Sequence, residues 1–183
     1  MLCLNSAHPS LIFSESMTRM RVGVTNGAEH YVEQHLPDNP KRFQHCICVL
    51  GLKGFTSGKH DWEVEVDQGT RSMISVLTES VKRKYLRDLS TQNGDWVINP
   101  YTTNWMQWLL EFFAPKKRNP KQIDHLTLQV NPKMIGIYLD YEGGQVSFYY
   151  AENMSDLYTH SGRMTGKVFS VSNNQMKLHL LSA

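Results

Sequence analysis

Apolar and polar residues alternate along several stretches of this chain. In residues 60–66, His-Asp-Trp-Glu-Val-Glu-Val, the apolar Trp62, Val64 and Val66 fall on one face and the three acidic residues fall on the other. A period of two is typical of antiparallel strands with one buried face. The same alternation recurs in residues 134–140, 145–150 and 176–180. The pattern therefore predicts a chain built mainly from β-strands.

Glycine-rich segments separate these stretches. Residues 141–144, Tyr-Glu-Gly-Gly, lie between two alternating runs, and paired glycines accept positive φ, so we predict a β-hairpin there. Further turns are predicted at Gly51, Gly54 and Gly58, at residues 37–40 and at residues 93–94. Many short strands joined by turns indicate a β-sandwich or a barrel.

One segment fits two patterns. In residues 105–112, Trp105, Trp108 and Phe112 are spaced as on a helix, whereas Met106, Trp108 and Phe112 would share the apolar face of a strand. We favour the strand because the neighbouring segments are strands and Pro115 follows.

Composition narrows the class of protein. The 183 residues are 40% hydrophobic, which suits one folded domain rather than a disordered chain. The formal charge of +2 gives no electrostatic case for nucleic acid as the main partner. The N-terminus lacks the pattern of a secretory signal, and no apolar stretch is long enough to cross a bilayer. We therefore expect a cytoplasmic protein with no membrane partner.

The cysteines favour neither a disulfide framework nor a metal site. The chain has three, Cys3, Cys46 and Cys48, and no second Cys pair accompanies Cys46 and Cys48. Structural zinc sites need four ligands at recognisable spacing. We expect residues 46–50 to form a buried apolar strand, because free cysteine is among the most buried residue types. No metal and no cofactor are expected.

The chain shows no motif for catalysis. There is no phosphate loop, no dinucleotide fingerprint and no zinc-protease motif. Asp140 and Glu142 are close together, but they flank the predicted hairpin turn, where capping explains them better than acid–base chemistry. We therefore expect a protein that is not an enzyme, with a hydrolase on a sandwich scaffold as the less favoured alternative.

Several strings, in chain order, resemble one family. Residues 55–66, Phe-Thr-Ser-Gly-Lys-His-Asp-Trp-Glu-Val-Glu-Val, look like the most recognisable motif of a PRY-SPRY domain. Similar strings occupy residues 36–43, 49–51, 79–84, 93–96 and 136–149. The chain is thereby identified as resembling the PRY-SPRY domains of tripartite-motif (TRIM), TRIM-like and butyrophilin proteins.

This resemblance implies an all-β fold, a bent two-sheet antiparallel β-sandwich of the concanavalin-like jelly-roll type. Residues 1–51 would be the PRY segment and residues 52–183 the SPRY segment of one domain. One departure stands out. The family usually has Trp, two further residues and then Gly in the strand after the main motif, whereas this chain has Ser72 and Ser75.

The resemblance also implies a function. Such domains are non-catalytic protein-interaction modules, and the nearest variety is the target-recognition domain of a TRIM-type ubiquitin ligase. Ligase chemistry would need a RING domain, for which this chain has too few cysteines. One alternative is a free-standing truncated SPRY protein with a scaffold or decoy role. Another is a sensor of phosphorylated ligands of the butyrophilin type.

Candidate contact residues follow from the family comparison. We expect loops to bind a protein partner, since Tyr, Trp and Arg are the usual hot-spot residues, although Trp105 in the core is an equally good interpretation. Self-association is expected to involve segments outside this chain. The predicted protein-binding residues are Arg71, Asn99, Tyr101, Asn104 and Trp105, and the predicted anion-binding residues are Lys82, Arg83, Lys84 and Arg87.

Overall fold

The chain folds into two antiparallel sheets, as the alternating pattern and the family resemblance predict. The computed structural model describes residues 1–23, 36, 39–66, 73–83, 96–98, 132–173 and 176–180. Within these ranges the elements are a 3-10 helix (Leu4–Ser6), β1 (Leu11–Phe13), β2 (Arg19–Val22), β3 (Cys48–Phe55), β4 (Lys59–Val66), β5 (Ile74–Thr78), β6 (Trp96–Ile98), β7 (Met134–Asp140), β8 (Gln145–Tyr150), β9 (Asp156–Ser161), β10 (Val168–Asn173) and β11 (Met176–Leu180).

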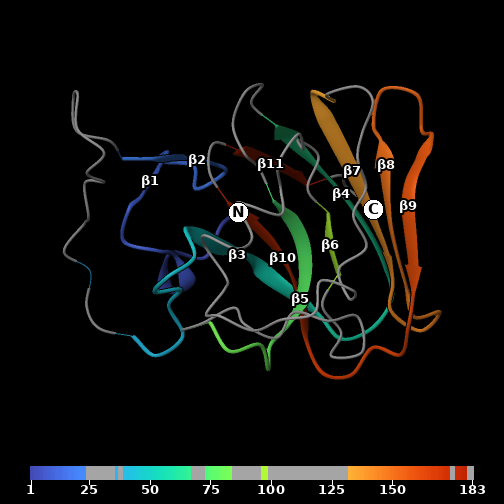
Figure 1. Cartoon of the computed structure of the whole chain (residues 1–183), viewed down its shortest axis with the longest axis horizontal. Helices are drawn as coiled ribbons and strands as arrows, with labels where there is room; N and C mark the ends of the chain where they lie inside the picture. The colour runs from blue at the N-terminus through green and yellow to red at the C-terminus, as the bar shows by residue number, and fades with distance from the viewer. Residues whose placement is uncertain are drawn as a thin grey trace, which may run out of the picture.

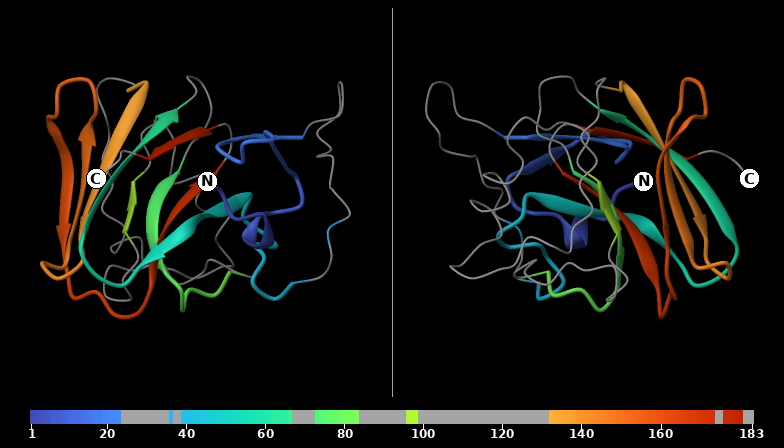
Figure 2. Two further views of the ribbon diagram at one scale, coloured as in Figure 1. Left: turned by 180° about the vertical axis from the view of Figure 1, so that it is seen from behind. Right: turned by 45° about the vertical axis from the view of Figure 1, so that its right-hand side comes forward.

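The strands divide into a larger and a smaller sheet. The seven-stranded sheet has the order β1-β2-β11-β4-β7-β8-β9, and the four-stranded sheet has the order β3-β10-β5-β6 (Figures 1 and 2). Strand β11, near the end of the chain, pairs with both β2 and β4. The N-terminal strands are thereby joined to the large sheet through the last strand, whereas the predicted boundary between residues 51 and 52 stays a prediction.

The main core lies between the two sheets. Trp62, Ile137 and Phe148 of the large sheet pack in one apolar cluster with Val76 and Val168 of the small sheet. Trp62 is only 2% exposed, and Val64 and Val66 are buried on the same face. The alternation in residues 60–66 is thus confirmed as the pattern of a half-buried strand.

A second apolar cluster covers the other face of the small sheet. Successive residues of β3 belong to different clusters: Val49 packs in the main core, whereas Cys48 and Leu50 pack in the second cluster with Phe43 and Leu77. Since side chains alternate across a sheet, β3 is buried on both faces. This explains why its first half is continuously apolar.

A buried arginine attaches the N-terminal segment to the second cluster. Arg42 is 8% exposed, and its Nη1 donates hydrogen bonds to the carbonyl oxygens of Leu4, at 3.1 Å, and Ala7, at 2.6 Å. The backbone N–H of Phe43 donates to Ser6. Charge-assisted hydrogen bonds of this kind are stronger than neutral ones, so residues 4–7 are held against residues 42–43.

Two predicted turns in β3 were wrong. Gly51 and Gly54 lie inside β3 rather than at turns, and β3 begins at Cys48 rather than at residue 46. Both glycines face side chains of the neighbouring strand: a Cβ would meet Ser170 at Gly51 and the ring of Phe169 at Gly54. Close packing across strands, not backbone conformation, therefore explains these two glycines.

The predicted hairpin and the turn before β4 are confirmed. Gly144 has φ +64° and Gly58 has φ +83°, which glycine adopts without steric cost. The backbone N–H of Gly58 donates to Oε2 of Glu142 at 2.8 Å, and the hydroxyl of Tyr141 donates to the carbonyl of Gly166 at 2.6 Å. These contacts join the turns at one end of the sandwich, which we call the hairpin end.

The turn-capping interpretation of Asp140 is also supported. Its Oδ1 accepts a hydrogen bond from the backbone N–H of Gly143 at 2.8 Å, and its Oδ2 lies 3.4 Å from Nζ of Lys59. The Gly143 hydrogen bond, assisted by Lys59, holds the pKa of Asp140 below its ordinary value.

A tyrosine covers a glycine on the outer face of the large sheet. Gly136 of β7 is paired with Tyr149 of β8, and a Cβ at Gly136 would collide with the Tyr149 ring. The Tyr149 hydroxyl donates to Oδ1 of Asp61 at 2.6 Å. Burial, together with this carboxylate, raises the pKa of Tyr149.

Other predictions have mixed outcomes. The sequence analysis did not identify β1, β2, β6 or β9. Strand β6 has three described residues, and β9 is an edge strand with exposed and half-buried positions, so neither shows a long alternation. The predicted strand at residues 105–112, the turn at residues 93–94 and half of the turn at residues 37–40 lie outside the described residues.

We predict that Trp62→Ala lowers the free energy of unfolding by about 3–5 kcal/mol, because it removes a large indole ring from a closely packed core. Denaturant unfolding followed by fluorescence measures this change. A loss below about 1 kcal/mol would contradict the core assignment.

Gly136→Ala is expected to cost about 1–3 kcal/mol, since the new methyl group would displace the Tyr149 ring. In a Tyr149→Ala background the same substitution should cost much less. A double-mutant cycle measures the coupling, and additive effects would show that the ring does not limit residue 136.

Asp140→Asn is expected to destabilise the domain at neutral pH, because it removes a charge that Gly143 and Lys59 stabilise. A carboxyl whose pKa is depressed in the folded state contributes stability above its unfolded pKa and loses it as the pH falls through the folded pKa. The stability difference between wild type and variant should therefore narrow in acid. Urea unfolding over a pH series tests this, and a constant difference would argue against it.

Candidate protein-binding loop end

The strand ends opposite the hairpin end provide the anchors of the candidate site. Strand β4 ends at Val66, whose N–H donates to the carbonyl of Lys133 at 2.8 Å, and the preceding residue, Glu65, is paired with Met134. In the small sheet Ile74 is paired with Ile98. These ends flank residues 67–72 and 99–131.

The two sets of strand ends lie at the same end of the sandwich. Ser172 of β10 is paired with Ile74 in the small sheet, and Met176 of β11 is paired with Val66 in the large sheet. Only a few residues separate Ser172 from Met176, so the chain must pass directly from one sheet to the other there. We call this end, defined by Val66, Met73, Ile98 and Met134, the loop end.

The anchors at the loop end are deeply buried. Val66 is 3% exposed, Met73 is 1% exposed and Ile98 is 2% exposed. Met73 packs in the second cluster, whereas Val66 and Ile98 pack in the main core. Segments that leave from these positions therefore start from closely packed backbone, the arrangement in which a rigid scaffold positions binding loops.

The predicted protein-binding residues are attached to this end. Arg71 lies between Val66 and Met73 in the chain, and Asn99 directly follows Ile98. Arg71, Asn99, Tyr101, Asn104 and Trp105 themselves lie outside the described residues. Their role in binding stays a prediction.

A serine occupies the position where the family usually has a glycine. Ser75 in β5 is 1% exposed, and its hydroxyl has no hydrogen-bond partner among the described residues. Its neighbours across the strands are Val171 and Val97. The small side chain thus fits a buried position, while Ser72 lies outside the described residues.

The two described members of the predicted anion site, Lys82 and Arg83, do not share the loop end. Lys82 and Arg83 follow the end of β5 at Thr78, which is paired with Val168 at the hairpin end. Arg83 donates a hydrogen bond from Nη1 to the carbonyl of Lys41 at 2.9 Å, and burial lowers the pKa of its guanidinium. Lys84 and Arg87 lie outside the described residues, so the four-residue anion site stays a prediction.

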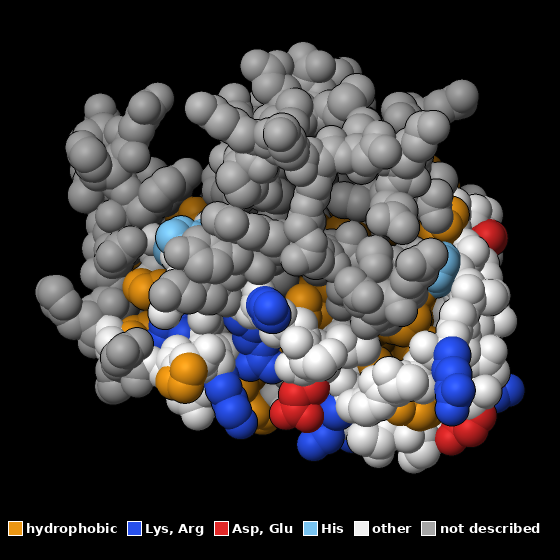
Figure 3. Space-filling model, turned by 60° about the horizontal axis from the view of Figure 1, so that its bottom comes forward, with side chains coloured by type: hydrophobic (Ala, Val, Ile, Leu, Met, Phe, Trp, Pro, Cys, Tyr) orange, Lys and Arg blue, Asp and Glu red, His pale blue; other side chains and the backbone are white. Residues whose placement is uncertain are grey.

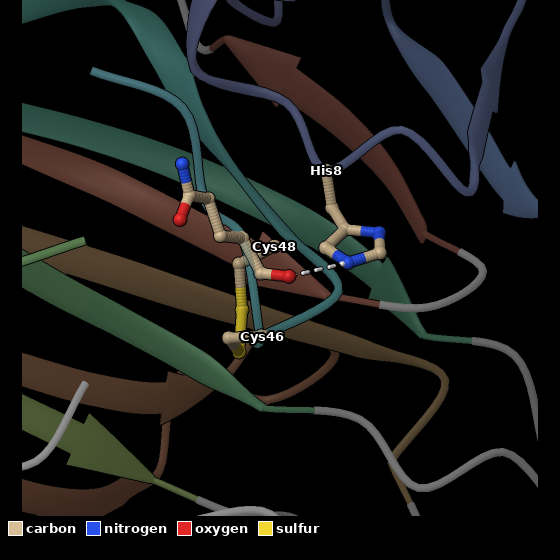
Figure 4. The surroundings of a disulfide bond; sticks show 4 residues. His8, Cys46 and Cys48 are labelled. Carbon is tan, nitrogen blue, oxygen red and sulfur yellow. Dashed lines mark hydrogen bonds between the residues drawn. A yellow bond between two sulfur atoms is a disulfide. The ribbon is translucent and has the colours of Figure 1, made fainter. Parts of the chain in front are cut away.

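The cysteine prediction needs correction. Cys46 and Cys48, expected as free thiols, are joined in a disulfide (Figure 4). The pair closes a very short loop, and its Cα atoms lie 5.3 Å apart, within the usual range for bridged cysteines. Both residues pack in the second cluster, which brings the two sulfur atoms to the same side. Cys3 is a free thiol.

A histidine supports the backbone around this disulfide. In Figure 4 a dashed line runs from the His8 ring to a backbone carbonyl oxygen. This oxygen belongs to Gln44 and lies 3.1 Å from Nε2 of His8. Its Nδ1 accepts a hydrogen bond from the N–H of Ser10, so Nε2 carries the proton and donates. The His8 N–H also donates to Cys48. These contacts are structural in kind.

The described part of the chain offers neither a metal site nor a membrane-spanning helix. No group of three or more His, Cys, Asp or Glu residues there could hold a metal ion. Among the same residues, no helix has the length and apolar character to cross a membrane.

Comparison with known proteins identifies the domain type. Residues 2–55 match the PRY, or SPRY-associated, domain and residues 59–178 match the SPRY domain. The chain is 42% identical over 165 residues to "Nuclear factor 7, ovary" of Xenopus laevis, covering 90% of this chain and 24% of that protein.

Two further relatives are a protein named as a ubiquitin ligase and a butyrophilin. The chain is 38% identical over 167 residues to "E3 ubiquitin-protein ligase TRIM69" of Rattus norvegicus, covering 90% of this chain and 29% of that protein. It is 36% identical over 157 residues to "Butyrophilin subfamily 1 member A1" of Homo sapiens, covering 86% of this chain and 26% of that protein. The chain thus spans about a quarter of the length of these relatives.

Solved structures share the fold. A structure described as "Crystal structure of TRIM65 PSpry domain" superposes with a TM-score of 0.67 at 15% identity, covering all of this chain and 90% of that one. One described as "Stonustoxin structure" superposes with a TM-score of 0.71 at 20% identity, covering 99% of this chain and 26% of that one. With both sheets, both sequence segments and these relatives in agreement, the chain belongs to the PRY-SPRY family, whose domains mediate protein–protein binding.

Proposed function

We propose that this chain is the target-recognition domain of a TRIM-type E3 ubiquitin ligase and binds its partner protein at the loop end. The observation that supports this best is the convergence of buried strand ends there. Val66, Met73 and Ile98 bring the segments that contain Arg71 and Asn99 to one end of a two-sheet scaffold.

The residue types at this end suit protein recognition. Arg71, Tyr101 and Trp105 belong to the three types most enriched among interface hot spots. A packed sandwich is already ordered before the partner binds, so ordering the scaffold adds nothing to the entropic cost of binding. Binding at this end would leave the core and the hairpin end unchanged.

The ligase part of the proposal rests on the relatives. TRIM69, which aligns over 90% of this chain, is named an E3 ubiquitin-protein ligase, and the aligned region is 29% of its length. We infer that ubiquitin transfer is performed outside the region that this chain represents, and that the PRY-SPRY domain selects the protein to be modified. A cytoplasmic location fits this role.

Arg71→Ala combined with Tyr101→Ala is expected to weaken partner capture at least about tenfold, since two hot-spot side chains would be lost. Proximity labelling in cells, comparing wild type with the double variant, would identify the partner and measure the loss. Arg163→Ala, an exposed change at the hairpin end, serves as the control and should leave labelling unchanged. Equal labelling by all three proteins would refute binding at the loop end.

The ligase role is tested separately in the full-length protein. The captured partner should gain ubiquitin with the wild-type domain and should not with the double variant. Capture without any ubiquitin transfer would favour the alternative, a scaffold or decoy role.

A further inference from the structure

The hairpin end carries a group of basic side chains that the proposed function does not use. Lys41, Lys82 and Lys167 are exposed and Arg83 is half-buried. One acidic residue, Glu79, lies among them and is also exposed. We call Lys41, Lys82, Arg83 and Lys167 the basic patch. Figure 3, which views the molecule from this side, shows Lys and Arg side chains outnumbering Asp and Glu.

Two hydrogen bonds connect the three distant segments that carry the patch. Arg83 donates from Nη1 to the carbonyl of Lys41 at 2.9 Å. The N–H of Glu79 donates to the carbonyl of Lys167 at 2.7 Å. Since Glu79, Lys82 and Arg83 follow one another closely, these two contacts place the backbone of Lys41 and that of Lys167 next to the same short segment.

Glu79 partly offsets the positive charge of the patch, since its carboxylate opposes the burial that lowers the pKa of the Arg83 guanidinium, but among the described residues it forms no salt bridge with any member of the patch. The ion pair recorded among those residues joins Lys59 and Asp140, at 3.4 Å, and involves no member of the patch. Arg83 has already lost part of its hydration, and one of its nitrogen atoms is fixed by the Lys41 carbonyl. An arginine held in this way presents its remaining N–H groups in a fixed orientation, which favours carboxylate recognition.

Apolar side chains border the patch. Leu52 is 57% exposed on β3, two residues before Gly54, beside which the Lys167 side chain lies. Leu4 is 42% exposed, and its carbonyl accepts a hydrogen bond from Arg42, the neighbour of Lys41. Cationic side chains flanked by exposed leucines match a ligand that combines negative charge with apolar groups.

These features favour a protein ligand over nucleic acid. A nucleic-acid backbone carries charge at every step and would bring a phosphate next to Glu79, whereas a peptide can place an uncharged residue there. Nucleic acid also offers the leucines no apolar side chain. The acidic run at residues 60–66 cannot occupy the patch, because it forms β4 inside the large sheet.

We propose that the basic patch is a second docking surface, which binds an acidic segment, rich in Asp and Glu and carrying an apolar residue, of another protein. This surface lies at the hairpin end, so it is separate from the loop end and could be occupied at the same time. Charge attraction of this kind speeds association and weakens with salt.

The test is a titration of the whole chain with a fluorescein-labelled Asp/Glu-rich peptide that contains one leucine, followed by fluorescence polarisation at low and at physiological salt. Lys82→Glu combined with Lys167→Glu should weaken binding about tenfold, because two attractions become repulsions. The matched control is Arg19→Glu combined with Arg21→Glu on β2, which makes the same change in net charge at two other exposed positions. This control variant should change the Kd for the acidic peptide by less than about twofold.

Every result of this titration either supports or overturns peptide binding at the basic patch. Thermal unfolding must show that both double variants stay folded, and Arg83→Ala provides an independent loss of one patch cation. The proposal is supported if the patch variants alone weaken peptide binding. It is overturned if wild type binds no peptide at low salt, if both reversals weaken binding equally, or if an RNA oligonucleotide or phosphatidylserine vesicles bind the patch more tightly than the peptide. Loss of partner capture at the loop end in the Arg71/Tyr101 variant would not affect peptide binding, so the two proposals fail separately.

Discussion

The burial of one apolar face of each sheet against the other is the constraint on which the rest of this domain depends. Trp62, Ile137 and Phe148 project from the large sheet into the same cluster as Val76 and Val168 of the small sheet. A shift of one residue in β4 would turn Trp62 outward and bring an acidic neighbour, Asp61 or Glu63, inward. The register of the sheets, and hence the position of every loop, follows from keeping this core closed.

The two ends of the sandwich are built differently. At the hairpin end, Glu142 accepts from the Gly58 backbone and Tyr141 donates to Gly166, so the turns that cross between the sheets are tied to the β7–β8 hairpin. At the loop end, the described residues that matter are buried anchors such as Met73 and Ile98. A structure held closed at one end can vary its segments at the other without losing its core.

The limits of sequence-based prediction have physical causes in this chain. Strands with one buried face, such as β4 and β7, show their period of two directly, and their boundaries were predicted to within a residue. The first half of β3 is buried on both faces, so its apolar pattern is continuous there, and the glycines of this strand were mistaken for turns. The disulfide between Cys46 and Cys48 was missed because two cysteines at this spacing also suit a buried strand. For the candidate site, the sequence indicated residue types and a family, but not which strand ends hold them.

The sequence by itself determined the faces of the alternating strands, the hairpin at residues 141–144 and the membership of a family, because all three depend on neighbouring residues in a fixed order. Only the tertiary structure decided that β11 lies between β2 and β4, and that Gly136 must stay small beneath Tyr149. It also separated Lys82 and Arg83 from the loop end and placed them beside Lys41 and Lys167. Such relations join residues far apart in the chain, and they are set by the register of strands around the shared core rather than by local preference.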